Sequence, residues 1–445
     1  MPNMATVTPS NVLAPEPRSA EWRLPTRIAF RFCFVYFSLY CVATQILNSV
    51  LAFPYIDFPE LDTVWPLRQV IAWTAAHIFR VHRELVFTGS GSGDKISDWV
   101  LVFLLLTTAA FATGVWSFLD RHRGSYANLY KWFRLFLRFA LAAQMLTYGC
   151  IKIIPLQMPY PGLFKLLEPY GDFSPMGVLW ASVGASPHYE TFAGCAELLA
   201  GILLIIPRTT LAGALVCLLD MTQVFTLNMT YDVPVKLLSF HLLLLSVFLL
   251  APDLQRLACF LFSDRAVPPA QHPLLFQTVR ANRIALAAQL LFGVALLGFN
   301  LRDARNSWYT YGGGGPKSPL YGIWNVEEFS IDGQSRQPLV ADKDRWRRVV
   351  FDRPTFVAFQ HMDETLEYFS LETKPDDHRL VLTTRRQNEW KANLTFQRLS
   401  QDQLTLDGDM DAHKVHMQLR LFDHKNAFPL VHDTFHWINE YPVNR

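Results

Sequence analysis

Seven long apolar runs constrain this chain of 445 residues more than any other feature of its sequence. An α-helix needs about 20 mainly apolar residues to cross the hydrocarbon core of a bilayer. One such run also occurs in the core of a soluble protein, but seven together predict a membrane protein. We therefore expect an all-α helical bundle of about seven transmembrane helices. The runs are 28–51, 99–119, 132–154, 189–206, 211–228, 237–251 and 284–301.

The charged residues are concentrated towards the end of the chain. They make up only 18% of all residues, against about 25% in a typical soluble domain. Residues 301–445 nevertheless hold 19 of the 40 Lys and Arg residues and 21 of the 38 Asp and Glu residues. The predicted organisation is a cytoplasmic tail (1–27), a transmembrane bundle (28–301), a linker (302–319) and a soluble extracytoplasmic domain (320–445).

Lysine and arginine in the short loops predict the orientation of the bundle. Arg121 and Arg123 follow the second run, and Arg256 and Arg265 follow the sixth. Because cytoplasmic loops carry an excess of these residues, the N-terminus is predicted to be cytoplasmic. An odd number of spans then places the C-terminal domain outside. The formal net charge of +2 gives no electrostatic reason to expect nucleic acid as a partner.

Three connecting segments have distinctive compositions. Residues 65–81 are rich in Ile, Ala, Trp and Phe and predict a helix on the outer surface of the membrane. Residues 88–94 are rich in Gly and Ser but lack the GK[ST] ending of a phosphate loop, which favours a flexible lead-in to the second span. Residues 155–187 combine prolines with aromatic residues, which suits an interfacial or re-entrant lid over the bundle.

Ionisable and polar side chains within the apolar runs form the candidate site. Such groups are costly in hydrocarbon, so they normally face the interior of a bundle and pair there. Two interpretations remain open: internal salt bridges that hold the helices in register, or a functional pocket open to the outer side. No metal site is expected. The candidate catalytic residues are Lys152, Glu197, Asp220, Lys236 and His241, and the candidate cofactor-binding residues are Tyr148, Gln223 and Asn228.

The last 126 or so residues show the period-two pattern of half-buried strands. Val415, Met417, Leu419 and Leu421 alternate with polar residues, and shorter alternations precede them. Eight or nine short strands without a helical run predict an antiparallel β-barrel. Asp-Gly pairs are hairpin-turn signals. Two such pairs occur, at Asp332-Gly333 and Asp407-Gly408. The late histidines, among them His413 and His416, are expected to face solvent, because residues three apart on a strand point to opposite faces.

Four short stretches carry a family resemblance. They are Tyr148-Gly-Cys-Ile-Lys152, Pro169-Tyr-Gly-Asp-Phe-Ser-Pro-Met-Gly177, Phe192-Ala-Gly-Cys-Ala-Glu197 and Tyr231-Asp-Val-Pro-Val-Lys236. Together they resemble the DoxX family over roughly residues 130–260. The resemblance implies a helical bundle in the bacterial inner membrane. The family name comes from a quinone-linked thiosulfate oxidoreductase subunit, although many members have no assigned reaction.

Two further resemblances are narrower. Gly322-Ile-Trp324 is similar to the G-x-W start of lipocalins, which implies a small barrel with an apolar interior. A span that ends in a small residue, any residue and lysine is similar to the vitamin K-dependent carboxylase group. In that group a lysine acts as a base, and Lys152 stands at the matching position.

Three functions follow as alternatives. The first is a membrane redox component that handles a quinone-like or thiol ligand in the polar pocket. The sequence shows no haem-like histidine pair or CxxC pair, so a redox partner protein would carry the electrons. The second is a binding or hand-off protein in which the β domain holds a small hydrophobic ligand. The third is a scaffold whose barrel docks a partner. The lipid bilayer is a partner in every case.

Overall fold

The computed structural model describes residues 21–51, 59, 61–88, 93–267, 274–374, 377–384, 390–433 and 436–441. The chain divides into two compact units. The bundle unit comprises Met1–Ile154 and His188–Asn306, and the barrel unit comprises Pro155–Pro187 and Ser307–Arg445. These limits differ from the expected ones, because the proline-rich segment 155–187 groups with the strands. The expected linker is also partly helical, since the last long helix continues to Thr310.

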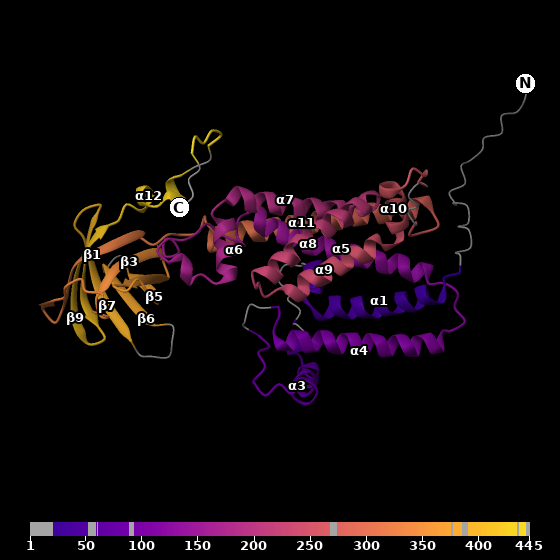
Figure 1. Ribbon diagram of the computed structural model, residues 1–445, viewed down its shortest axis with the longest axis horizontal. Coiled ribbons are helices and arrows are strands. Elements are labelled where there is room, and N and C mark those ends of the chain that lie inside the picture. The colour runs from indigo at the N-terminus through magenta and orange to yellow at the C-terminus, as the bar shows by residue number, and fades with distance from the viewer. Residues whose placement is uncertain are drawn as a thin grey trace, which may run out of the picture. The chain divides into compact units, whose positions relative to one another are not determined.

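Long helices that run side by side build the bundle unit (Figure 1). In chain order the helices are α1 (Leu24–Ala43), α2 (Gln45–Leu51), η1 (Leu61–Thr63), α3 (Leu67–His77), α4 (Ile96–Leu119), α5 (Ala127–Ile153), α7 (Pro187–Ile205), η3 (Pro207–Thr209), α8 (Thr210–Thr230), α9 (Lys236–Leu250), η4 (Ala251–Asp253), α10 (Leu254–Phe262) and α11 (Val279–Thr310).

Among the described residues, six helical segments are long and apolar enough to cross a membrane. They correspond to α1, α4, α7, α8, α11 and the combined stretch from α9 to α10. Helix α5 has 27 residues and is also long enough, but Lys131, Arg134, Arg138 and Lys152 lower its mean hydropathy. The predicted multi-pass membrane bundle is therefore confirmed, with a helix count close to the expected seven.

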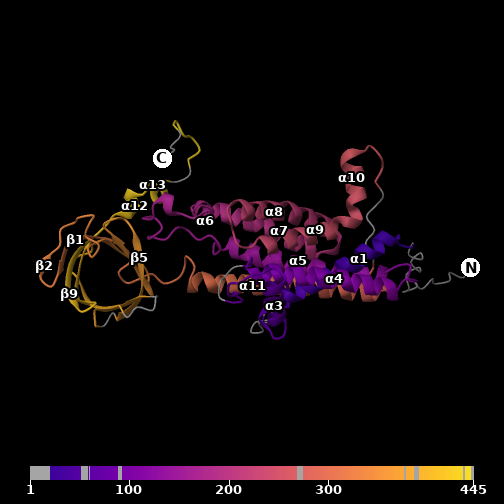
Figure 2. The same cartoon turned by 60° about the horizontal axis from the view of Figure 1, so that its bottom comes forward.

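One of the expected spans is interrupted, whereas the run 237–251 matches α9 and is followed by a turn. The run 28–51 is not one helix, because α1 ends at Ala43 and Thr44 is extended, with φ −119° and ψ 175°. The hydroxyl and the backbone N–H of Thr44 both donate to Tyr40 O, at 2.8 and 3.1 Å. Pro252 lies in η4 between α9 and α10. Figure 2 shows α10 turned away from the direction of α9.

Helix α3 matches the expectation of a separate helix within 65–81. Ile71, Thr74 and Ala75 are buried at helical spacing, whereas Val70 and Trp73 are exposed. Figure 1 shows α3 nearly end on, across the direction of α4. An exposed face with a large aromatic residue is typical of a helix that lies at a membrane surface.

The barrel unit is built on an antiparallel meander in which β1 pairs with β9 and closes the sheet. Eight strands form the closed barrel, and the two-residue β2 extends β1; Figure 2 shows the ring. The strands are β1 (Gly322–Ile331), β2 (Gln334–Ser335), β3 (Trp346–Arg353), β4 (Phe356–His361), β5 (Leu366–Lys374), β6 (Arg379–Thr384), β7 (Lys391–Arg398), β8 (Gln403–Met410) and β9 (His413–Leu421). The predicted β-barrel is confirmed.

Large apolar side chains fill the inside of the barrel. Trp324 is fully buried, and its indole Nε1 donates to Leu320 O at 2.9 Å. The rings of Trp346 and Phe359 stack with centroids 3.6 Å apart. The same buried cluster contains Phe329, Phe351, Phe369, Val349, Val357, Leu371, Leu380, Leu382, Leu394, Leu404, Leu406, Val415, Met417 and Leu419. The interior is therefore a packed core.

One predicted hairpin turn is confirmed and the other is wrong. Asp332 and Gly333 connect β1 and β2, with φ of 51° and 78°. Asp407-Gly408 lies inside β8 instead. A Cβ on Gly408 would lie 2.1 Å from Asn393 O, so this glycine permits close approach of β7. The actual turn before β9 uses Asp411 and Ala412, both with positive φ.

The barrel unit also contains shorter elements. They are η2 (Tyr170–Asp172), α6 (Pro175–Gly184), α12 (His424–Ala427) and α13 (Pro429–His432). Leu163 and Leu167 pack against Ile323, Val350 and Ala358. These three residues alternate with interior ones along β1, β3 and β4, so they face outward. Leu163 and Leu167 of segment 155–187 thus pack on the outside of the barrel, and the expectation of a lid over the bundle stays a prediction.

Candidate functional site

Three helices of the bundle unit bring Lys152, Glu197 and Asp220 together, and we call these residues the charged trio. Lys152 on α5 forms an ion pair with Glu197 on α7 through Nζ and Oε1, and the Glu197 side chain is only 1% exposed. Asp220 on α8 is close enough to interact electrostatically with both partners. Two buried carboxylate oxygens, Glu197 Oε2 and Asp220 Oδ2, have no hydrogen-bond partner among the described residues.

Glycines explain how α5 and α7 approach closely enough for this ion pair. A Cβ on Gly194 of α7 would lie 2.7 Å from Ile153 N and 2.8 Å from Lys152 Cβ. A Cβ on Gly149 of α5 would lie 2.8 Å from the side chain of Leu198. Both distances are shorter than real Cβ contacts, so only glycine fits at either position. Small residues commonly provide such close packing between helices in membranes.

A chain of amides and hydroxyls continues from Tyr148, one turn before Lys152. Gln45 Nε2 donates to Tyr148 OH at 2.9 Å and to Gln144 Oε1 at 3.2 Å. Gln144 is fully buried, and its Nε2 donates to Ser49 Oγ at 2.6 Å. Tyr148 is also within electrostatic range of Glu197. The polar neighbourhood of the charged trio therefore extends from α5 to α2.

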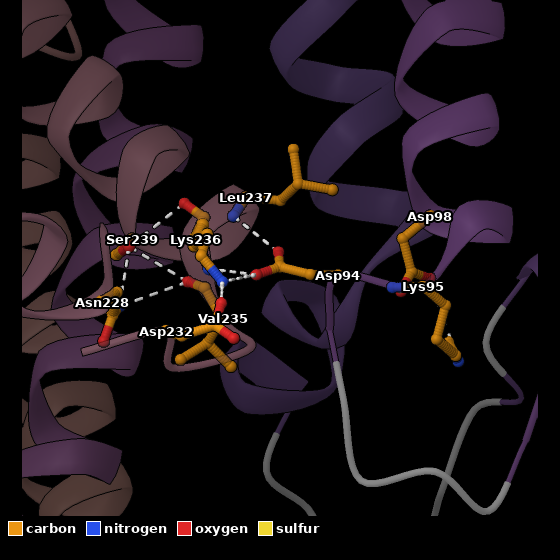
Figure 3. A network of polar contacts seen from close by, with 9 residues as sticks. All are labelled: Asp94, Lys95, Asp98, Asn228, Asp232, Val235, Lys236, Leu237 and Ser239. Atoms are coloured by element: carbon orange, nitrogen blue, oxygen red, sulfur yellow. Dashed lines mark hydrogen bonds and ion pairs between the residues drawn. The ribbon is translucent and has the colours of Figure 1, made fainter. Parts of the chain in front are cut away.

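Lys236 belongs to a different network (Figure 3). Asp94 accepts hydrogen bonds from the backbone N–H groups of Lys236 at 2.7 Å and Leu237 at 2.9 Å. It thereby supplies a carboxylate cap to the N-terminus of α9 from a distant part of the chain. Lys236 Nζ lies 3.8 Å from Asp94 and 2.9 Å from Asp232. Two carboxylates hold this lysine, and these contacts are those of a structural clamp.

His241 has separate partners, whereas Asn228 joins the network of Figure 3 through Ser239, whose hydroxyl donates to Lys236 O at 3.1 Å. His241 Nδ1 lies 2.6 Å from Leu237 O, and Nε2 lies 2.6 Å from Tyr36 OH. Nδ1 must donate to the carbonyl, and in the neutral imidazole Nε2 accepts the proton of the Tyr36 hydroxyl. The ring also stacks on Tyr40 with centroids 3.7 Å apart. Asn228 Nδ2 donates to Ser239 Oγ at 3.0 Å.

The eight candidate residues thus divide among several environments. Lys152, Glu197 and Asp220 lie together with Tyr148 beside them, whereas Lys236 and His241 contact other residues. Gln223 is exposed on the surface of the bundle unit. The expectation of one shared arrangement applies to the charged trio and Tyr148 only.

Sequence reasoning missed a buried arginine. Arg31 on α1 is 1% exposed; its Nε and Nη2 donate to Tyr126 OH at 2.9 and 2.6 Å. Its Nη1 donates to Ser117 Oγ at 2.8 Å, and Nη2 also donates to Asp120 O at 2.9 Å. The signal was available, since an arginine inside an apolar run has to find partners.

The histidines on β9 have separate acidic partners. His413 Nδ1 lies 2.8 Å from Asp332 Oδ2, and His416 Nδ1 lies 2.5 Å from Asp407 Oδ1. Both histidines are exposed, as expected. Across the described residues, no group of three or more His, Cys, Asp or Glu side chains is arranged to hold a metal ion.

Comparison with known proteins yields one weak similarity. The chain is 29% identical over 130 residues to the uncharacterized protein YwoB of Bacillus subtilis (strain 168). This alignment covers 27% of the present chain and 74% of YwoB. No family model matches the chain, and no solved structure matches it.

Proposed function

We propose that this protein is a membrane redox component that exchanges protons with a small, hydrophobic, quinone-like molecule at the charged trio. The observation that carries the proposal is a count of charges. One ammonium group, on Lys152, pairs with the carboxylate of Glu197 and lies within electrostatic range of the carboxyl group of Asp220. Because uncompensated charge is costly in hydrocarbon, the trio must hold an additional proton or take up a cation.

The unsatisfied oxygens favour this reading over a purely structural salt bridge. A structural ion pair in a membrane would match its charges one to one and satisfy every buried atom. Lys236 also lies beside two carboxylates, but Asp232 is 83% exposed and Asp94 accepts two backbone N–H groups, so water and a helix end stabilise the second negative charge there. The charged trio lacks such stabilisation, because Glu197 Oε2 and Asp220 Oδ2 have no partners among the described residues.

The quinone-like substrate is supported by the resemblance to the DoxX family. Reduction of a quinone to a quinol consumes two protons and two electrons. In this proposal the trio delivers its one additional proton, the second proton comes from water along the same polar path, and a redox partner protein delivers the two electrons. Tyr148 and its hydrogen-bond chain through Gln45 extend the polar path along which protons reach the trio.

The same proposal includes the bacterial inner membrane and a cytoplasmic N-terminus. Arg23 precedes α1, Arg121 and Arg123 follow α4, and Arg208 lies between α7 and α8. If successive spans run in opposite directions through the membrane, all these positions lie on the same side of it. An excess of arginine at one end is typical of the cytoplasmic side.

The other functions have less support. In a carboxylase-like reaction Lys152 would act as a base, yet its ammonium group donates to Glu197. A lysine in that state has no lone pair with which to accept a proton. A hand-off protein would need space for a ligand in the β domain, but Trp324, Phe351 and Phe359 fill the barrel.

Replacement of Asp220 provides the test. Asp220→Asn keeps the ion pair between Lys152 and Glu197 but removes the second carboxyl group. Purified protein in nanodiscs would be titrated with a short-chain quinone, and proton uptake on reduction would be recorded with a pH-indicator dye. We expect Asp220→Asn to fold normally and to lower proton uptake at least about tenfold. Asp232→Asn is the matched control, because that side chain is 83% exposed.

Two outcomes would count against the proposal. If the wild-type protein binds no quinone, the substrate assignment fails. If Asp220→Asn takes up protons as fast as the Asp232→Asn control, the charged trio is a structural feature.

A further inference from the structure

A row of cations lies on one face of α5, in the half of the helix that does not carry the charged trio. Lys131, Arg134 and Arg138 occupy positions i, i+3 and i+7, which places them on one side of an α-helix. In the part of the chain that the structure describes, the one carboxylate paired with any of them is Asp253, 3.7 Å from Arg134 Nη2. Asp253 also pairs with Arg256. This face of α5 therefore carries more positive than negative charge.

Arg138 lies nearest the middle of α5 and has no carboxylate partner among the described residues. It is only 7% exposed. Its Nη2 donates to Gln289 Oε1 on α11, and its Nε is buried without a partner. Its Nη1 has no hydrogen bond either but keeps accessible surface, so a ligand can reach it. Because a cation without a counter-ion is costly in hydrocarbon, an anion at Nη1 would stabilise this side chain.

Arg134, one turn earlier on α5, offers a second donor within reach of the same ligand. Its Nη2 donates to Leu249 O at 3.2 Å, and its Nε is buried without a partner among the described residues. Its Nη1 makes no hydrogen bond with those residues but keeps accessible surface, and the side chain is 18% exposed. Residues four apart lie one above the other on a helix face. Arg134 and Arg138 are also within electrostatic range of each other, so one anion can contact both.

Arg31 on α1 shows how the bundle holds an arginine that has a structural role. Arg31 is buried as well, but its Nε, Nη1 and Nη2 all donate hydrogen bonds to side-chain or backbone oxygens. Buried polar atoms normally find such partners. Arg134 and Arg138 instead leave donors free on adjacent turns of a single helix, which is the arrangement expected of an anion site.

We propose that Arg134 and Arg138 bind the oxyanion of a phosphate group. The planar fork of a guanidinium group matches the spacing of phosphate oxygens, and hydrogen bonds between two charged groups are stronger than neutral ones. Lys131 adds a third positive charge on the same face, nearer to the start of α5. Two sources supply this chemistry, the headgroup of an anionic lipid and a soluble phosphate. The site does not depend on the proposed redox function.

Thermal unfolding of the full chain in detergent tests this proposal, because a ligand that binds the folded state raises the unfolding midpoint. The protein would be heated with phosphatidylglycerol, with phosphatidylcholine of identical acyl chains, or with inorganic phosphate, all at constant ionic strength. We expect phosphatidylglycerol or inorganic phosphate to raise the midpoint more than phosphatidylcholine does. A shift with phosphatidylglycerol alone identifies a lipid headgroup as the ligand, and a shift with inorganic phosphate identifies a soluble one.

Arg138→Gln is the main variant, because it removes a cation that has no carboxylate to leave unpaired. We expect it to abolish the shift produced by the phosphate ligand. Without ligand it should unfold at the wild-type temperature or above, since an uncompensated charge has been removed. Arg121→Gln is the matched control, because Arg121 is an exposed arginine between α4 and α5. It should keep the full shift.

A second variant keeps the test decisive if Arg138→Gln fails to fold. Arg134→Lys preserves the charge beside Asp253 but removes the guanidinium fork, so the shift should fall to less than about half. The proposal is overturned if neither phosphate ligand stabilises the wild type more than phosphatidylcholine does. It is equally overturned if Arg138→Gln, or Arg134→Lys in its place, keeps the same shift as Arg121→Gln.

Discussion

The bundle unit and the barrel unit bury different kinds of side chain. Inside the barrel lie aromatic and aliphatic groups, while charged pairs such as Arg420 with Glu327 stand exposed on its surface. The bundle has the reverse arrangement, with exposed apolar residues such as Phe111 and Leu219 and an ion pair in its interior. Water solvates the charges of the barrel, whereas lipid solvates the apolar surface of the bundle and leaves its charges to one another.

This difference indicates where function resides. The barrel obeys the ordinary rules of a soluble core, so its stability follows from apolar burial. Buried atoms without hydrogen-bond partners among the described residues occur in both units, at Arg345 Nε and Thr373 Oγ1 of the barrel unit as well, but the charged trio has two of them on carboxylates. Departures from consistent packing tend to occur at functional sites. The four predictions below test this division, beginning with the largest expected effect.

Truncation of the barrel core should have the largest effect on stability and none on proton exchange. Trp324→Ala removes a fully buried side chain and should lower the free energy of unfolding of the barrel unit by about 3–5 kcal/mol. Thermal unfolding of the full chain measures this loss, and Leu339→Ala at a 61% exposed position is the control. If a Trp324→Ala protein with a folded barrel lost quinone-dependent proton uptake, the barrel would take part in proton exchange, which contradicts the assignment of that function to the bundle unit alone.

Separation of α5 and α7 should disturb both stability and the charged trio. Gly194→Ala places a Cβ 2.7 Å from Ile153 N, so the helices must move apart at a cost of about 1–3 kcal/mol. We expect proton uptake to fall together with stability. Gly298→Ala on α11 is the matched control, because no atom lies within 4 Å of its added Cβ. That variant should be neutral or slightly more stable. Equal behaviour of the two variants would show that the close approach is dispensable.

Loss of the Tyr36 hydroxyl should have a smaller effect. Tyr36→Phe leaves His241 Nε2 buried without its hydrogen bond and should cost about 1–2 kcal/mol, measured by unfolding in detergent. Tyr40→Phe keeps the ring that stacks on His241 and should cost less. If Tyr36→Phe abolished proton uptake while the charged trio stayed intact, His241 would belong to the functional site together with the charged trio.

The smallest expected effect is a pH dependence in the barrel unit. Burial raises the pKa of Asp352 above its ordinary value of 3.8. The stability contributed by the neutral acid is therefore complete below pH 3.8 and is lost as the pH rises through the raised pKa. Asp352→Asn should stabilise the barrel at pH 7 by less than about 1 kcal/mol, and this gain should shrink as the pH approaches 4.

Asp402 provides a control whose contribution to the stability of the barrel changes with pH in the opposite direction. A hydrogen bond from Ser400 lowers the pKa of Asp402, so its contribution is present above pH 3.8 and is lost as the pH falls through the lowered pKa. Asp402→Asn should therefore destabilise the barrel at pH 7. Unfolding midpoints measured between pH 4 and pH 7 would contradict this account if both variants shifted in the same direction.

Much of the fold could be predicted, because a long apolar run indicates a helix in lipid and an alternating pattern indicates a strand with one face in water. The apolar run 99–119 corresponds to α4, and the alternation that begins at Val415 corresponds to β9. Local departures from these patterns could not be predicted from the sequence. The first run is interrupted at Thr44, which is extended, although no proline or glycine marks that position. Gly408 resembled a turn residue, yet it lies within a strand because a neighbouring strand approaches too closely for any Cβ.

The candidate site was predictable by residue type but not by partner. Lys152 and Lys236 look alike in the sequence, since each is a lysine at the end of an apolar run. The structure pairs one with Glu197 inside the bundle and the other with Asp94, whose carboxylate lies 142 residues earlier in the chain. Nothing local to either lysine encodes that choice.

The sequence by itself determined that this chain has a membrane bundle and a β-barrel, because hydrophobic burial depends on composition and period. Only the tertiary structure decided which charges meet. An ion pair requires two side chains to come within a few ångströms, and that depends on the rotation of each helix and on glycines such as Gly149 and Gly194 that permit contact. The grouping of segment 155–187 with the barrel had the same origin, since Leu163 and Leu167 fit a surface formed by strands far along the chain.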